Sequence, residues 1–99
     1  MPPYTERDLK DAARFRDAIH KEALEKARIR DPGIEEILDP YPPEAFFEEK
    51  WDYPGAWYTY VTIPQGFRSR DDFVGYLVRY TIEHHRKNRL GWLHFPRRR

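Results

Sequence analysis

The sequence predicts a small α+β fold with two main helices packed on a two- or three-stranded sheet. Two long stretches carry apolar residues at steps of three and four, which is the spacing of an amphipathic helix. A shorter stretch between them is rich in aromatic and β-branched residues, which are the residue types enriched in strands. The predicted order is therefore helix, proline-rich bridge with short helical turns, strand, helix and short strand.

The length of the chain predicts a single domain, because 99 residues leave no room for a second core. Hydrophobic residues make up 39% and charged residues 35%, so the aromatic rings must supply much of the core. The absence of cysteine excludes disulfides and thiolate metal sites. The first residues show no secretory signal, and no apolar run approaches the ~20 residues of a membrane span. We therefore expect a soluble, cytoplasmic protein without a membrane partner.

The first helix is predicted to begin at Thr5, which with Asp8 resembles a capping box. The sequence Asp31-Pro32-Gly33 is expected to end it. One apolar stripe runs along this helix and is formed by Leu9, Ala12, Phe15, Ile19, Ala23 and Ala27.

The bridge is predicted to contain two short helical turns, at Ile34–Leu38 and Phe46–Lys50, each started by a proline. Between them the chain must be extended or turned, because residues that precede proline avoid the helical region. Tyr53-Pro54-Gly55 is predicted to be a turn, and the clearest strand is Ala56–Ile63.

The second helix is predicted to begin at Ser69 and to continue to about Arg89. Asn88 or Gly91 is expected to close it, and Trp92–Phe95 is predicted to be a short strand. The helix is long enough to return this last strand parallel to the strand at Ala56–Ile63, and antiparallel pairing of the two strands is the alternative. The bridge is the candidate for a third strand.

Charges are sorted along the chain, although the net charge is only +1. The bridge, residues 31–56, is acidic and rich in proline, whereas the basic tail, residues 96–99, follows a stretch without acids. Such segregation bears on the choice of partner. The acids are Asp31, Glu35, Glu36, Asp39, Glu44, Glu48, Glu49 and Asp52, with Lys50 as the one base among them.

No motif predicts catalysis, so we expect a protein that is not an enzyme and holds no cofactor or metal. His84 and His85 are adjacent on a helix and cannot easily face one ion, and no His-Glu-x-x-His pattern is present. Ser69 is better placed as a helix cap than as a nucleophile. The loop Gln65–Arg70 leads into a helix and carries two arginines, but a capped loop with solvated arginines is the favoured interpretation.

The leading hypothesis is a non-catalytic adaptor, inhibitor or accessory subunit that docks on a larger protein or on itself. Tyrosine, tryptophan and arginine dominate the energetically important positions of protein interfaces. The alternative is binding to RNA or DNA, because cations alternate with aromatic residues near the C-terminus. The predicted protein-binding residues are Tyr58, Tyr60, Trp92, Arg86, Glu48 and Glu49. The predicted nucleic-acid-binding residues are Arg79, Arg86, Lys87, Arg89, Arg97, Arg98 and Arg99.

Overall fold

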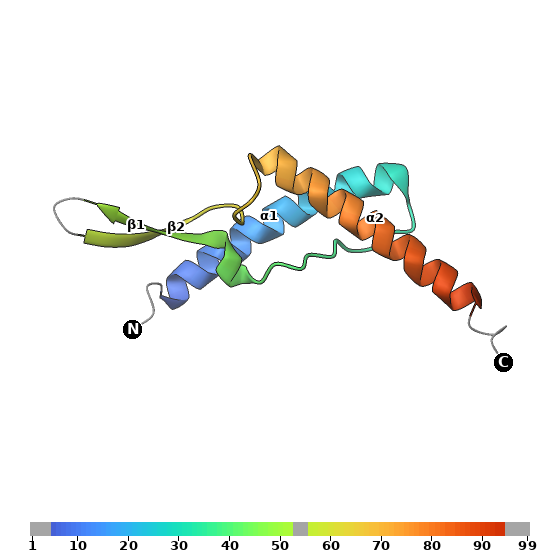
Figure 1. Ribbon diagram of the computed structural model, residues 1–99, viewed down its shortest axis with the longest axis horizontal. Coiled ribbons are helices and arrows are strands. Elements are labelled where there is room, and N and C mark those ends of the chain that lie inside the picture. Colours follow the sequence, from blue (N-terminus) through green and yellow to red (C-terminus); the bar gives the residue numbers. More distant parts are fainter. Residues whose placement is uncertain (1–4, 53–55, 95–99) are drawn as a thin grey trace.

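The protein has two long helices packed on a small two-stranded antiparallel sheet, as a computed structural model shows (Figure 1). The structure describes residues 5–52 and 56–94, and the side chains of residues 5–48 and 59–87. The α+β prediction is confirmed. The elements in chain order are α1 (Glu6–Arg30), the 3-10 turn η1 (Pro43–Phe46), β1 (Phe47–Asp52), β2 (Ala56–Val61) and α2 (Arg70–His94).

Helix α1 begins as predicted, with a complete capping box. The Thr5 hydroxyl accepts from the Asp8 amide at 3.3 Å, and the Asp8 carboxylate accepts from the Thr5 amide at 2.9 Å. At the other end the Asp31 amide donates to the Ala27 carbonyl and closes the last turn. The small residues of the predicted stripe are fully buried and let α2 approach closely.

Helix α2 begins as predicted but extends further than predicted. The Ser69 hydroxyl accepts from the Asp72 amide at 3.1 Å, which caps the first turn. The predicted strand at Trp92–Phe95 is wrong, because α2 continues through Asn88 and Gly91 and includes Trp92 to His94. Phe95 lies outside the described residues. In the described part of the chain no third strand is available to pair with this segment, and a helix satisfies its own backbone groups.

The bridge contributes β1, which pairs antiparallel with β2. The sheet is therefore a hairpin and not a parallel crossover. The second predicted helical turn starts at Pro43 as expected, but its continuation to Lys50 is wrong: η1 ends at Phe46 and β1 follows at once. Strand β2 is two residues shorter than predicted, and the expected turn at 53–55 lies outside the described residues. The register pairs Phe47 with Val61, Glu48 with Tyr60, Glu49 with Thr59, Lys50 with Tyr58, Trp51 with Trp57 and Asp52 with Ala56.

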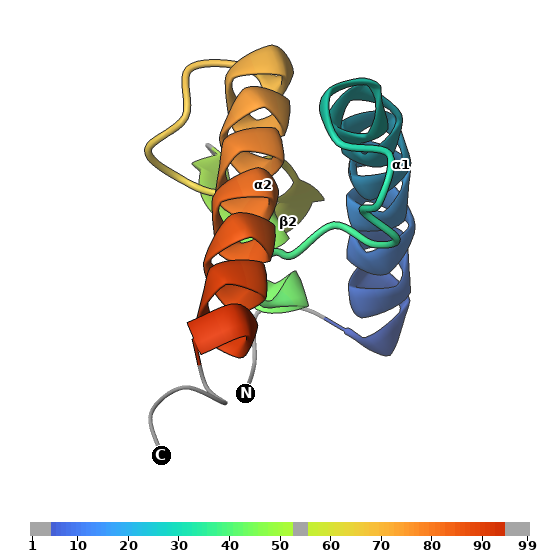
Figure 2. The ribbon, with the colours of Figure 1, turned by 90° about the vertical axis from the view of Figure 1, so that its right-hand side faces the viewer.

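The first part of the bridge runs as an extended chain between the two helices (Figure 2). The predicted helical turn at Ile34–Leu38 is therefore wrong. Thr81 on α2 explains the difference, since its hydroxyl accepts from the Leu38 amide at 3.0 Å and donates to the Leu38 carbonyl at 3.4 Å. Both backbone groups of Leu38 thus have a partner outside the bridge, and a helix is not needed to satisfy them.

Aromatic rings fill the space where α1, α2 and η1 meet. Phe46 and Phe73 are fully buried, with ring centroids 5.7 Å apart in an edge-to-face arrangement. Tyr41 from the bridge packs edge-on against Phe67, Phe73 and Tyr76. Many of the aromatic residues therefore form the core and are not spare surface anchors.

The hairpin and the last turns of α2 project at opposite ends of the molecule (Figure 1). Within the described residues, neither helix combines the length and the apolar character needed to cross a bilayer.

Candidate functional site

Asp39 fixes the acidic bridge to α1. Its Oδ2 lies 2.6 Å from His20 Nε2 and accepts from Arg16 Nε at 3.3 Å, while its Oδ1 accepts from the Tyr41 amide at 2.8 Å. The Asp39 side chain is only 1% exposed. A buried carboxylate needs such partners, because an unpaired charge in the interior is very costly.

The pKa of Asp39 is lowered from the ordinary value of an aspartate. Burial alone would raise this pKa, because it disfavours the charged form. The hydrogen bonds from His20 and from the Tyr41 amide, together with the charges of His20 and Arg16, outweigh burial. Asp39 is therefore ionised at neutral pH and holds the bridge in place.

A second histidine–aspartate pair fixes the start of the bridge to α2. His85 Nδ1 lies 2.9 Å from Asp31 Oδ2, and Asp31 Oδ1 accepts from the Gly33 amide at 3.1 Å. Arg28 Nε donates to the Ile34 carbonyl at 2.8 Å, which ties the same stretch to α1. Two of the acids of the bridge thus have bonding partners inside the molecule, and this weakens the prediction that the whole bridge is a negative docking surface.

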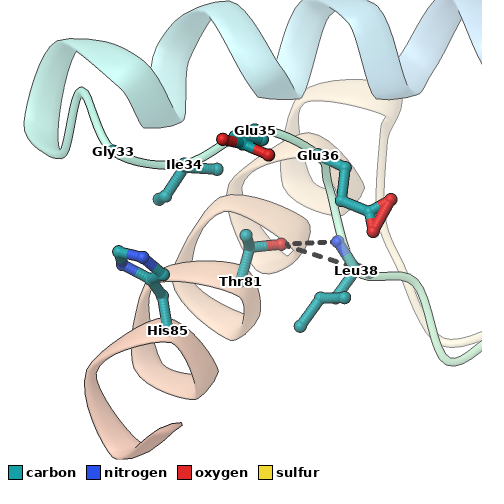
Figure 3. A pocket seen from close by; sticks show the side chains of 7 residues that line it. All are labelled: Gly33, Ile34, Glu35, Glu36, Leu38, Thr81 and His85. Atoms are coloured by element: carbon teal, nitrogen blue, oxygen red, sulfur yellow. Dashed lines mark hydrogen bonds between the residues drawn. The ribbon is translucent and has the colours of Figure 1, made fainter. Parts of the chain in front are cut away.

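A hollow of about 380 Å³ lies between the bridge and α2 (Figure 3). Thr81 and His85 lie on its α2 side, and Glu35 and Glu36 are exposed on the bridge side. The Thr81 hydroxyl is bonded to the Leu38 backbone and His85 to Asp31, so both side chains have structural partners. Within the described residues no group of three or more histidine or acidic side chains is arranged to hold a metal ion.

The predicted protein-binding residues fall on two separate elements. Tyr60 is 36% exposed and stands opposite Glu48 on the hairpin. Tyr58 is two positions before Tyr60 on β2, and Glu49 stands opposite Thr59. The other two predicted residues lie on α2 near the opposite end of the molecule, and these are Arg86 and Trp92. The structure therefore does not join the six residues into one patch.

The predicted nucleic-acid-binding residues that the structure describes all lie on α2. Arg79, Arg86 and Lys87 are exposed, and Arg89 is in the helix with its backbone alone described. The residues of the basic tail, Arg97, Arg98 and Arg99, lie outside the described residues.

Sequence reasoning missed an arginine that joins this basic surface. Arg30 lies with Arg79, Ile82, Glu83 and Arg86 around a shallow hollow of about 230 Å³. A signal for this position was present, since Arg30 follows the buried Ala23 and Ala27 at helical steps and thus continues the face of α1 that meets α2. His20 was missed too, although it directly follows a stripe residue.

The loop Gln65–Arg70, which leads into α2, is capped by Ser69 as expected. Arg70 Nη2 lies 3.0 Å from Glu22 Oε1 on α1, so this arginine already has a carboxylate partner. The Asp72 carboxylate accepts from the Arg68 amide at 3.0 Å, which fixes the loop further.

The chain matches no protein-family model, and comparison with curated proteins and with solved structures gives no significant similarity.

Proposed function

We propose that this chain is a non-catalytic adaptor, inhibitor or accessory subunit that docks on a larger protein through the hairpin β1–β2. The observation that supports this proposal is the projection of the hairpin past the two helices (Figure 1). A two-stranded ribbon is marginally stable by itself, and its outer edges can pair with another chain. A partner that covers the ribbon would therefore stabilise it.

Two tyrosines give the hairpin a docking face. Tyr58 and Tyr60 are two positions apart on β2, which is the period of one strand face, and Glu48 stands opposite Tyr60 in the register. Tyrosine contributes a large rigid contact area together with a polar hydroxyl. Glu48 adds a negative charge beside this face, which favours a partner surface that carries basic residues. Arg86 and Trp92 belong to the C-terminal part of α2, which lies at the opposite end of the molecule from the hairpin (Figure 1), so they are not part of this docking face.

Replacing Tyr58 and Tyr60 together with serine is expected to weaken capture of the partner at least about tenfold, because aromatic anchors at interfaces are often worth 2 kcal/mol or more. The measurement is affinity purification from the native source, followed by mass spectrometry and titration of the protein recovered. Ile29→Ser is the matched control, since Ile29 is 82% exposed on α1. A wild-type chain that is monomeric by light scattering and recovers no stoichiometric protein would contradict the proposal.

A second candidate function is binding to RNA or DNA, which is supported by the exposed cations on α2. Arg79, Arg86 and Lys87 have no ion pair within the described residues. If about six phosphates are contacted, affinity should fall about 10³-fold between 50 and 200 mM salt. Docking through tyrosines should change far less over this range. Replacing Arg97, Arg98 and Arg99 with alanine is expected to abolish nucleic-acid binding and to leave docking through the hairpin in place.

A further inference from the structure

The hollow around Arg30, called the arginine hollow below, draws its cations from both helices. Arg79 and Arg86 are seven residues apart on α2, which places them two turns apart on one face. Arg30 comes from the last turn of α1. Ile82 is 6% exposed and lies among them, whereas the three arginines are exposed. The arginine hollow therefore combines a partly apolar lining with charged groups that solvent can reach.

Among the described residues, the guanidinium groups of this hollow have no partner, unlike those of three arginines at the contacts between elements. Arg16 is bonded to Asp39, Arg28 to the Ile34 carbonyl and Arg70 to Glu22. In the described part of the chain, no hydrogen bond or ion pair involves the guanidinium groups of these three arginines, although Glu83 also lines the hollow. Three positive charges and one negative charge leave a local charge of about +2, which repels further cations and attracts an anion.

Guanidinium groups bind oxyanions through paired N–H donors, and carboxylates and phosphates have the matching geometry. A single carboxylate would leave the arginine hollow with a charge of +1. A phosphate monoester carries close to two negative charges at pH 7 and would balance the charge. The volume of about 230 Å³ also leaves space for such a group.

We propose that the arginine hollow formed by Arg30, Arg79 and Arg86 binds a dianionic phosphate group. The phosphate can be free or can end a nucleic-acid strand, because the hollow recognises the group and not its carrier. This inference is independent of the hairpin and of its docking partner. For the nucleic-acid candidate it supplies a contact for the phosphate at a strand end, which adds to the contacts of the basic tail.

The first test measures the thermal unfolding of the full chain by circular dichroism, with inorganic phosphate as the probe at pH 7.5. We expect 10 mM phosphate to raise Tm by about 3–6 °C relative to chloride at equal ionic strength. A rise of this size corresponds to a phosphate concentration a few times above Kd. Arg79→Gln and Arg86→Gln should each weaken phosphate binding about tenfold, since each removes charge-assisted hydrogen bonds. Arg14→Gln is the matched control, because Arg14 is an exposed helical arginine that lies near Asp11.

The second test compares an oligonucleotide that carries a 5′-phosphate with the same oligonucleotide without it. Tighter binding of the phosphorylated form, with displacement by inorganic phosphate, supports the proposal and identifies a strand end as one carrier. An equal rise of Tm in chloride and phosphate overturns it, as does a phosphate effect that survives in both Arg79→Gln and Arg86→Gln. Salt-sensitive binding of both oligonucleotides with equal affinity and no effect of inorganic phosphate would also overturn it, while leaving the nucleic-acid candidate in place.

Discussion

Replacing Asp39 with asparagine is expected to lower the free energy of unfolding by about 2–3 kcal/mol at pH 7. The substitution keeps the shape of the side chain but removes the charge that faces Arg16 and His20. Breaking a buried ion pair typically costs about 3–5 kcal/mol because the partner keeps an uncompensated charge. The side chains of Arg16 and His20 are 26% and 22% exposed, so water solvates them in part and the expected loss is smaller. Urea unfolding followed by circular dichroism measures it.

The stability difference between wild type and Asp39→Asn is also expected to depend on pH. The pKa of Asp39 is lowered in the folded protein, whereas an unfolded aspartate titrates near 3.9. The stabilisation by Asp39 is therefore complete above this value and is lost as the pH falls through the lower, folded pKa. The two proteins should converge in stability as the pH drops below about 4, because asparagine does not titrate.

Asp11→Asn is the control for this substitution. Asp11 is 46% exposed and lies 3.6 Å from Arg14, so its loss should cost no more than about 0.5 kcal/mol. Equal effects of Asp11→Asn and Asp39→Asn would show that the contacts of Asp39 do not hold the bridge.

Replacing Phe46 with alanine is expected to cost about 3–5 kcal/mol, which is the usual range for a buried phenylalanine. Phe46 is fully buried at the end of η1, with Phe15 of α1 and Phe73 of α2 on its two sides. Stabilities of small domains are about 5–15 kcal/mol, so this single change would bring the chain close to unfolding. Chemical denaturation measures the loss.

The same substitution is expected to loosen the hairpin, because Phe46 precedes β1 directly. Its carbonyl accepts from the Thr62 amide at 2.8 Å, which extends the pairing beyond the end of β2. Hydrogen exchange at Thr62 should therefore accelerate in Phe46→Ala. Phe46→Leu is the matched control and should cost less than about 2 kcal/mol, since leucine keeps most of the apolar volume. Similar losses for alanine and leucine would contradict the central packing of this ring.

The position of Phe46 links this packing to the proposed function. The Phe46 ring contacts Phe15 of α1 and Phe73 of α2. Strand β1 starts at the next residue and pairs with β2, which carries Tyr58 and Tyr60. A core substitution at Phe46 should thus reduce docking together with a large loss of stability, whereas the tyrosine substitutions should reduce docking with a much smaller loss. Comparing the two classes of variant separates a positioning effect from a direct contact.

Signals between neighbouring residues were enough to predict several elements. The capping box at Thr5 and Asp8, the apolar stripe that follows it and the cap at Ser69 depend on residues three or four positions apart. The strand near Ala56–Val61 was equally predictable, because its aromatic and β-branched residues favour a strand whatever the partner strand is. These features predicted two helices, a strand and the α+β class correctly.

The course of the bridge and the end of α2 depend on contacts between segments that are distant in sequence. Leu38 is extended because Thr81, 43 residues away, bonds to both of its backbone groups. Asp39 and Asp31 are internal ties because His20 and His85 lie opposite them, and no local pattern predicts such partners. The grouping of Arg30 with Arg79 and Arg86 likewise depends on how α1 packs against α2. Each of these contacts joins residues distant in sequence, and their energies therefore cannot be read from the spacing of neighbours along the chain.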